Sequence, residues 1–225
     1  MVVLLHGLGG SRTAWGPQLA TLSTARRVVA WDLPGYGASA PLAGPLTFDG
    51  LADAVAGLLD AVGTHGAHLV GLSFGGMIAQ HAVLRHPARV RSLALLATSP
   101  AFGLDGTSAT TWRAARLAPL DAGRTPAAIA PEVIDAIAGP ALTATARAEQ
   151  VAAMARIEPA ALRQAIACLP THDTRDRLAE VTVPTLVLTG ALDTETPPSY
   201  GRALAEAIPG ARFAVVPGAG HLLPT

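Results

Sequence analysis

The chain has 225 residues, a length that suggests a single domain. Half of its residues are apolar and 14% are charged, and sixteen basic residues balance sixteen acidic ones, so a nucleic-acid-binding surface is not expected. All sixteen basic residues are arginine, which excludes a Walker lysine and a Schiff-base lysine. Asparagine is absent, which excludes a Cys-His-Asn triad, and the single cysteine, Cys168, excludes an intrachain disulfide and a cysteine-rich zinc site.

The sequence also excludes the usual membrane signals. No apolar run approaches the roughly 18 residues that a membrane-spanning helix needs. The first seven residues, Met1 to Gly7, lack the basic region of a signal peptide. We therefore expect a cytoplasmic protein that does not bind a membrane.

Short apolar runs that end at Gly or Pro alternate with longer helical patterns. This alternation is typical of the α/β class, in which helices cover both faces of a parallel sheet in three layers. The predicted helices are Leu51–Val62, the segment from Ser73 to just before Pro87, and Ser199–Ala207. The predicted strands, about six in number, are Val2–Leu5, Val28–Trp31, His68–Gly71, Ser92–Ala97, Thr185–Thr189 and Arg212–Val216.

The segment from residue 101 to 180 interrupts this alternation. It contains no convincing strand and is predicted to form several Ala-rich helices separated by prolines, namely Pro119, Pro126, Pro131, Pro140, Pro159 and Pro170. A helical segment inserted before the last two strands of a sheet is typical of a lid. The predicted organisation is therefore a core of residues 1–100 and 181–225 with a lid of residues 101–180.

The strongest motif is Gly-Leu-Ser-Phe-Gly at residues 71–75, between a predicted strand and a predicted helix. G-x-S-x-G in this context marks a sharp turn that exposes a nucleophilic serine, here Ser73. Side chains at Gly71 and Gly75 would collide with the neighbouring strand and helix. The alternative, an ordinary Gly-rich turn between a strand and a helix, does not need a serine at the centre.

A second glycine-rich segment, His-Gly-Leu-Gly-Gly at residues 6–10, directly follows the first predicted strand. Acyl transfer needs backbone N–H groups that stabilise an oxyanion, and the predicted donors are Leu8 and Phe74. A dinucleotide-binding loop would need Gly or Ala at position 12, where Arg12 stands. His6 is expected to brace this loop rather than to react.

A serine nucleophile needs a base, and His221 is the predicted one because it lies in a Gly-rich loop after the last predicted strand. His65 and His68 could form a metal site but lack a nearby third ligand, so no metal or cofactor is expected. The other histidines are expected to lie away from the site, with His172 as a weak alternative base. These are His81, His86 and His172.

The base needs a carboxylate to orient it. Asp193 follows the fifth predicted strand and is the predicted partner of His221, with Glu195 as the alternative. Asp32 is expected to brace the turn after the second strand. The resulting chain order, Ser73, Asp193, His221, is the Ser-Asp-His order of α/β-hydrolases.

With these motifs the sequence resembles the lid-bearing α/β-hydrolases over essentially its whole length. Further segments at residues 75–80, 89–93 and 173–178 resemble 3-oxoadipate enol-lactonases. The resemblance implies a cofactor-independent serine hydrolase whose partner is a small-molecule ester or lactone. It also implies that two strands before the oxyanion strand and a helix after His221 are missing. We therefore expect Val28–Trp31 to form an exposed edge, one sheet face to be partly uncovered, and the chain to associate.

Other functions with the same triad stay open on the sequence alone. They are hydrolysis of a C–C bond in ring-cleavage diketo acids and cofactor-free perhydrolysis, and a non-catalytic ligand-binding scaffold is the alternative of a different class. The substrate and the oligomeric state are not determined by the sequence. Trp112, the only tryptophan of residues 101–180, is a candidate for the substrate-binding wall, and packing in the core is the competing role.

Overall fold

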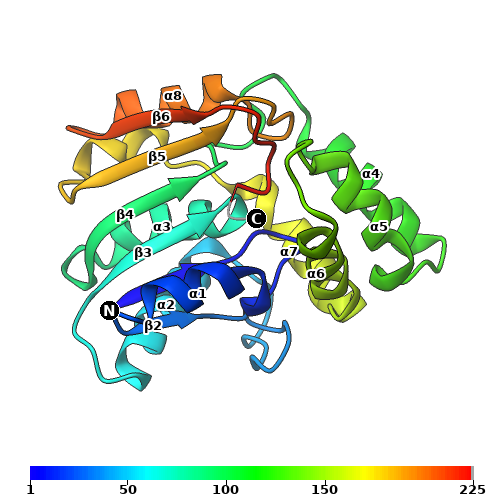
Figure 1. Cartoon of the computed structure of the whole chain (residues 1–225), viewed down its shortest axis with the longest axis horizontal. Helices are drawn as coiled ribbons and strands as arrows, with labels where there is room; N and C mark the ends of the chain where they lie inside the picture. The colour runs from blue at the N-terminus through cyan, green and yellow to red at the C-terminus, as the bar shows by residue number, and fades with distance from the viewer. Residues whose placement is uncertain (224–225) are drawn as a thin grey trace.

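The computed structural model describes residues 1–223, which contain a six-stranded sheet in the order β2-β1-β3-β4-β5-β6. All five strand pairings are parallel. Parallel neighbours must be joined by crossover connections, and helices form most of them (Figure 1). The strands are β1 (Val2–Leu5), β2 (Val28–Ala30), β3 (Ala67–Leu72), β4 (Val90–Leu96), β5 (Thr185–Gly190) and β6 (Arg212–Val216).

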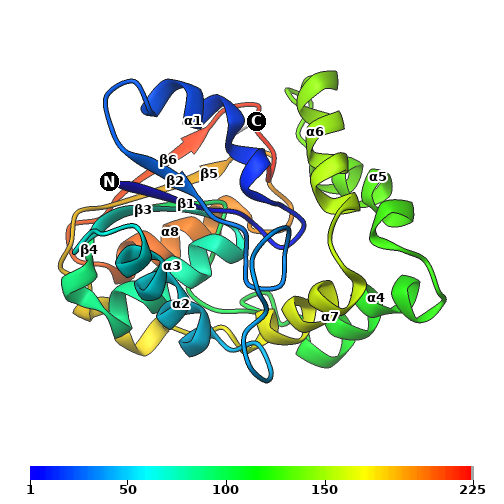
Figure 2. The same cartoon turned by 90° about the horizontal axis from the view of Figure 1, so that it is seen from below.

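Helices cover both faces of this sheet, so the predicted layered α/β fold is confirmed (Figure 2). On one face lie α2 (Phe48–Ala61), α3 (Phe74–Arg85) and α8 (Pro198–Ala207), and α1 (Gly16–Leu22) lies on the other. Short 3-10 helices span Arg12–Trp15, Pro87–Arg89, Leu169–Thr171 and Arg175–Glu180.

Between β4 and β5 the chain forms the helical insertion, which we define as helices α4 to α7. These are α4 (Ala109–Asp121), α5 (Pro126–Ile137), α6 (Ala144–Ala155) and α7 (Pro159–Cys168). The insertion lies beyond the carboxyl ends of the strands, beside the loops that leave the sheet there (Figure 1). It is therefore placed over the edge of the sheet where ligands of open α/β sheets bind.

The predicted elements match the observed ones except at their ends. The helix predicted from Leu51 begins three residues earlier, at Phe48, because the Thr47 side chain accepts a hydrogen bond from the Gly50 N–H and caps it. Helix α1 was not predicted; it begins at Gly16, with Pro17 in its first turn.

Two prolines in the insertion do not separate helices as predicted. Pro119 lies inside α4 and Pro131 inside α5. Pro131 has no N–H to donate to the preceding turn, a loss that normally ends a helix. Helix α5 continues to Ile137 because Ile129 and Ile134 on its inner face are buried in the core, and their burial offsets the lost hydrogen bond.

The two faces of the sheet differ in how completely they are covered. Leu69 and Val187, which point toward α2, α3 and α8, are fully buried. Val70 and Leu186, their chain neighbours, point to the α1 face and remain half-buried. β2 is an edge strand and its residues are also half-buried, whereas Trp31 is only 6% exposed. Association of the chain through these surfaces stays a prediction.

A buried histidine, His172, and a half-buried one, His81, connect the end of the insertion to the core. His172 donates from Nε2 to the Ser99 carbonyl (2.9 Å), and its Nδ1 lies 3.1 Å from His81 Nε2 on α3. The His81 ring stacks on Phe48 with centroids 4.4 Å apart. Burial lowers the pKa of His172 to about 3 and that of His81 to about 4. Both imidazoles are therefore neutral at pH 7.

This cluster gives stability a pH dependence of a defined sign. The unfolded chain binds protons on these histidines below about pH 6.5, whereas the folded chain excludes them until about pH 4, so the free energy of unfolding falls as pH falls between these limits. Replacing His172 with Gln removes one group that binds a proton only in the unfolded chain over this pH range. The slope of the unfolding free energy against pH should therefore decrease by about 1 kcal/mol per pH unit. Urea unfolding at pH 7.0, 6.0 and 5.0 measures this slope, and equal slopes for the wild type and the variant would contradict the role of His172.

Candidate active site

The predicted site residues follow the carboxyl ends of four strands. Leu8 follows β1, Ser73 directly follows β3, Asp193 follows β5 and His221 follows β6. Because all strands of the sheet are parallel, these ends lie at one edge of it. The fold therefore brings together residues that are up to 213 positions apart in the chain.

Ser73 sits on the sharp turn predicted between β3 and α3. Its backbone angles are φ 54° and ψ −117°, which a residue with a side chain rarely adopts. A Cβ on Gly71 would lie 2.4 Å from the Gly75 carbonyl oxygen, and a Cβ on Gly75 would lie 2.2 Å from the Leu5 carbonyl oxygen. Both glycines are thus required by close backbone approach, which presses the start of α3 against β3 and β1.

Residues at the end of β4 hold this turn through hydrogen bonds. The Ser73 N–H donates to the Leu96 carbonyl (2.8 Å), and the Thr98 hydroxyl donates to the Ser73 carbonyl (2.9 Å). Ala97 between them also has a positive φ, 44°. The Thr98 side chain fits only because Gly76 has no Cβ, which would lie 2.8 Å from it. The strained serine is therefore fixed on both sides.

The glycine-rich loop after β1 lies against Ser73, since a Cβ on Gly7 would be 3.4 Å from the Ser73 Cβ. His6 braces this loop: its Nδ1 lies 2.8 Å from the Gly7 carbonyl and its Nε2 accepts from the Leu33 N–H (3.0 Å). Burial lowers the His6 pKa to about 4, so the ring is neutral at pH 7.

Tyr36 holds the same loop from its other side. Its ring stacks on His6 with centroids 5.6 Å apart, and its hydroxyl donates to the Leu8 carbonyl (2.9 Å). The Leu8 N–H belongs to the preceding peptide unit, whose Gly7 carbonyl is held by His6. Leu8 and Phe74 lie on the two backbone segments that border Ser73, and their role as oxyanion donors stays a prediction.

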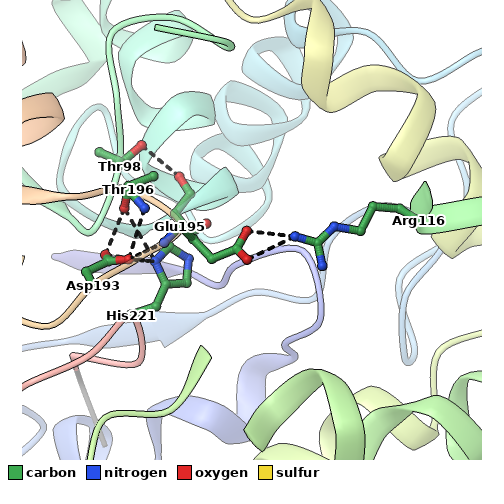
Figure 3. A network of polar contacts seen from close by, with 7 residues as sticks. Thr98, Arg116, Asp193, Glu195, Thr196 and His221 are labelled. Carbon is green, nitrogen blue, oxygen red and sulfur yellow. Dashed lines mark hydrogen bonds and ion pairs between the residues drawn. The ribbon is translucent and has the colours of Figure 1, made fainter. Parts of the chain in front are cut away.

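His221 and Asp193 form a buried pair (Figure 3). His221 Nδ1 lies 3.0 and 2.9 Å from the two carboxylate oxygens of Asp193. Asp193 also accepts hydrogen bonds from the N–H groups of Glu195 and Thr196 (both 2.9 Å) and from the Thr196 hydroxyl (2.8 Å). With its Nδ1 facing a carboxylate, the imidazole presents Nε2 as the free acceptor.

The Asp193 carboxyl is ionised at neutral pH. Burial alone would raise its pKa, but the hydrogen bonds and charge interaction with His221 and the hydrogen bonds from Thr196 outweigh burial and lower the pKa below its usual value. Asp193 therefore presents a full negative charge to the imidazole, and a protonated His221 would be stabilised by it.

Glu195, the alternative partner of His221, points the other way. Both of its carboxylate oxygens accept from one nitrogen of Arg116 on α4, at 2.9 and 2.8 Å (Figure 3). The structure therefore pairs Asp193 with His221 and Glu195 with the helical insertion.

The loop that carries His221 is fixed by three glycines. A Cβ on Gly190 would lie 2.3 Å from the Gly220 carbonyl oxygen, and a Cβ on Gly139 would lie 2.3 Å from the Gly220 N. The His221 N–H donates to the carbonyl of Ile137, the last residue of α5. The turn after α5 and the end of β5 thus enclose the histidine loop, and the insertion helps to position it.

Ser73 and His221 line one cavity between the sheet edge and the insertion. Its wall is mainly apolar and comes from the loop after β1 and from all four helices of the insertion. The insertion contributes Trp112, Arg116, Ile129, Val133, Ile134, Ile137, Gln150, Met154, Leu162 and Ile166 to the lining.

Trp112 belongs to this wall and is also packed. Its ring meets Phe102 edge-on with centroids 5.5 Å apart, and the Arg116 guanidinium carbon lies 5.5 Å from its centroid. Trp112 is therefore a half-buried side chain that packs against the core and also lines the cavity, and its contact with a substrate stays a prediction.

The other histidines lie elsewhere. His68 is hydrogen-bonded to Ser92 on the sheet, and His172 belongs to the buried cluster with His81. Residues 1–223 contain no group of three His, Cys, Asp or Glu side chains suited to a metal ion. None of the helices described there is both long and apolar enough to traverse a membrane.

Several residues of the site were missed by the sequence analysis. Thr196 was not singled out, although a hydroxyl three residues after an acid can return a hydrogen bond to it. Arg116 carried no signal, because its partner Glu195 is 79 positions away. The apolar wall of α5 had a signal, since residues 129, 133, 134 and 137 have the spacing of one helix face.

The comparisons with known proteins agree with this architecture. The chain is 36% identical over 224 residues to a pimeloyl-[acyl-carrier protein] methyl ester esterase from Chromobacterium violaceum, covering 98% of this chain and 86% of that protein. Among solved structures, it resembles an esterase from Thermogutta terrifontis with a TM-score of 0.87 and 30% identity (99% and 83% covered). It resembles the enol-lactonase from Burkholderia xenovorans with a TM-score of 0.84 and 29% identity (98% and 84% covered).

The family comparison covers nearly the whole chain. Residues 2–225 match the alpha/beta hydrolase family. The match includes the strand and turn that carry Ser73 as well as the helical insertion and the loops of Asp193 and His221. On its sequence and on its fold, the chain belongs to the alpha/beta hydrolase family.

Proposed function

We propose that this chain hydrolyses small carboxylic esters through an acyl-enzyme on Ser73, with His221 as general base and Asp193 as the residue that orients it. The observation that carries the proposal is that Ser73, on its strained turn, lines the same cavity as His221, whose Nδ1 is bonded to a buried carboxylate. Similarity to esterases over 98% of the chain supports ester chemistry in particular.

In the first half of the reaction, His221 Nε2 takes the proton of the Ser73 hydroxyl as the oxygen attacks the ester carbonyl. The developing oxyanion accepts hydrogen bonds from the N–H groups of Leu8 and Phe74. Asp193 stabilises the imidazolium that forms. Collapse of the tetrahedral intermediate breaks the bond to the alcohol, which leaves with the proton from His221.

In the second half, a water molecule replaces the alcohol. His221 takes a proton from the water, and the water oxygen attacks the acyl carbon bound to Ser73. The same two N–H groups stabilise the second oxyanion. Collapse returns the proton from His221 to Ser73 and releases the carboxylic acid.

In this proposal residues 101–180, which contain the helical insertion, form the lid of the cavity that holds the acyl chain, the acyl cavity. Its apolar side chains exclude water from the bound substrate, and Trp112 forms part of the wall that the substrate contacts. An enol-lactone is a second candidate substrate, favoured by the structural likeness to the Burkholderia xenovorans enzyme. Both substrates use the same acyl-enzyme chemistry.

Replacing Ser73 with Ala removes the nucleophile and should lower kcat on p-nitrophenyl butyrate by about 10⁴-fold or more. Circular dichroism and melting temperature control for the fold. Activity above a few per cent of wild type in Ser73→Ala would assign the nucleophile elsewhere.

Replacing Asp193 with Asn keeps the shape of the side chain but removes the charge that orients and stabilises His221. We expect kcat to fall by about 10³- to 10⁴-fold, as for comparable replacements in serine hydrolases. The matched control is Glu195→Gln, two residues away, which should change kcat on the same neutral ester by less than about tenfold. If Glu195→Gln were the more damaging change, the orienting carboxylate would be Glu195.

Replacing Gly139 with Ala should displace the His221 loop, because the new Cβ would lie 2.3 Å from the Gly220 N. We expect kcat to fall by at least about tenfold, since a shift of about 1 Å costs this much or more. Gly57→Ala, at an open position on α2, is the control and should not affect kcat. Unchanged kcat in Gly139→Ala would show that the insertion does not position the histidine.

A further inference from the structure

The charges that line the acyl cavity are confined to one ion pair. Of the lining residues described, Arg116 and Glu195 carry fixed charge at pH 7, and the rest are apolar, glycine or neutral polar groups apart from His6 and His221. Their side chains are 35% and 34% exposed, so they stand at the mouth of the cavity and not in its depth.

Glu195 neutralises the charge of the Arg116 guanidinium at the mouth of the cavity. One nitrogen of Arg116 holds both oxygens of Glu195, and its guanidinium carbon lies 5.5 Å from the Trp112 ring centroid. The Glu195 backbone is itself held, because its N–H donates to Asp193. The pair therefore joins the insertion to the turn that carries the orienting acid.

A substrate that carries its own carboxylate meets the Glu195 anion as well as the Arg116 cation at the mouth of the cavity. The attraction to Arg116 is largely cancelled by the repulsion from Glu195, because the two charges are held against each other. The carboxylate therefore gains little there to offset its desolvation in an otherwise apolar cavity. A neutral acyl chain does not bear this cost.

We infer that the Arg116–Glu195 ion pair makes this enzyme selective for esters with neutral, apolar acyl chains and selects against acyl chains that end in a carboxylate. The inference rests on the proposed function and narrows its substrate class. It places 3-oxoadipate enol-lactone, which retains a free carboxylate, among the disfavoured substrates. The two residues act here as specificity determinants, not as members of the reacting groups.

Two esters of equal chain length test the inference: p-nitrophenyl hexanoate, which is neutral, and the mono-p-nitrophenyl ester of adipic acid, which ends in a carboxylate. The readout at pH 7.5 is the kcat/KM value for the hexanoate divided by that for the adipate ester. A variant that lowers the fraction of folded enzyme lowers both values equally and leaves this ratio unchanged. The wild-type ratio should favour the hexanoate by at least about tenfold, a factor equal to about 1.4 kcal/mol.

The variants should move this ratio in opposite directions. Glu195→Gln frees the Arg116 cation and should lower the ratio by about tenfold, whereas Arg116→Gln leaves the Glu195 anion unpaired and should raise it. The double variant should return to within about threefold of the wild type. Arg124→Gln breaks the Arg124–Glu132 pair elsewhere on the insertion and should leave the ratio unchanged.

Two results would overturn the inference while leaving the proposed function intact. They are a wild-type preference for the adipate ester, and a shift of the ratio in the same direction in both single variants, which would indicate a structural role only. A chain that hydrolyses neither ester through Ser73 would instead contradict the proposed function, and the inference with it.

Discussion

The close approach of three backbone segments at Ser73 is the constraint on which the site depends. The start of α3 lies so near to β3 and β1 that no side chain fits at Gly71 or Gly75. Ser73 absorbs this geometry in a backbone conformation with φ 54°, and hydrogen bonds to the end of β4 hold it there. Packing of the whole sheet thus stabilises a strained residue whose side chain stands clear of the turn.

The helical insertion takes part in the geometry of the site as well as covering it. It touches the histidine loop through Gly139 and Ile137 and the acid turn through the pair of Arg116 with Glu195. On the proposed function, we expect side-chain changes in the insertion to act on rate through His221 and on substrate choice through the cavity wall.

Much of the fold could be predicted from the sequence because its strands are short apolar runs that end at Gly or Pro, as at Leu5 before His6-Gly7. The placement of the candidate residues at one edge of the sheet could be predicted for the same reason, since each follows a strand end, and their catalytic roles stay predictions. Contacts between distant side chains could not be predicted in full. The sequence favours Asp193 as the partner of His221 but leaves Glu195 open, and the fold turns Asp193 toward His221 and Glu195 toward Arg116. The continuation of α5 through Pro131 could not be predicted either, because tertiary burial, not local propensity, maintains that helix.

We propose that Ser73 is an activated nucleophile, and the proposed function depends on it. Incubation with a fluorophosphonate, followed by intact-protein mass spectrometry and peptide mapping, tests it without knowledge of the substrate. We expect one label per chain, located on Ser73, with labelling slowed strongly in the Asp193→Asn variant. Failure of the folded chain to react, or a label on another serine, would contradict the account.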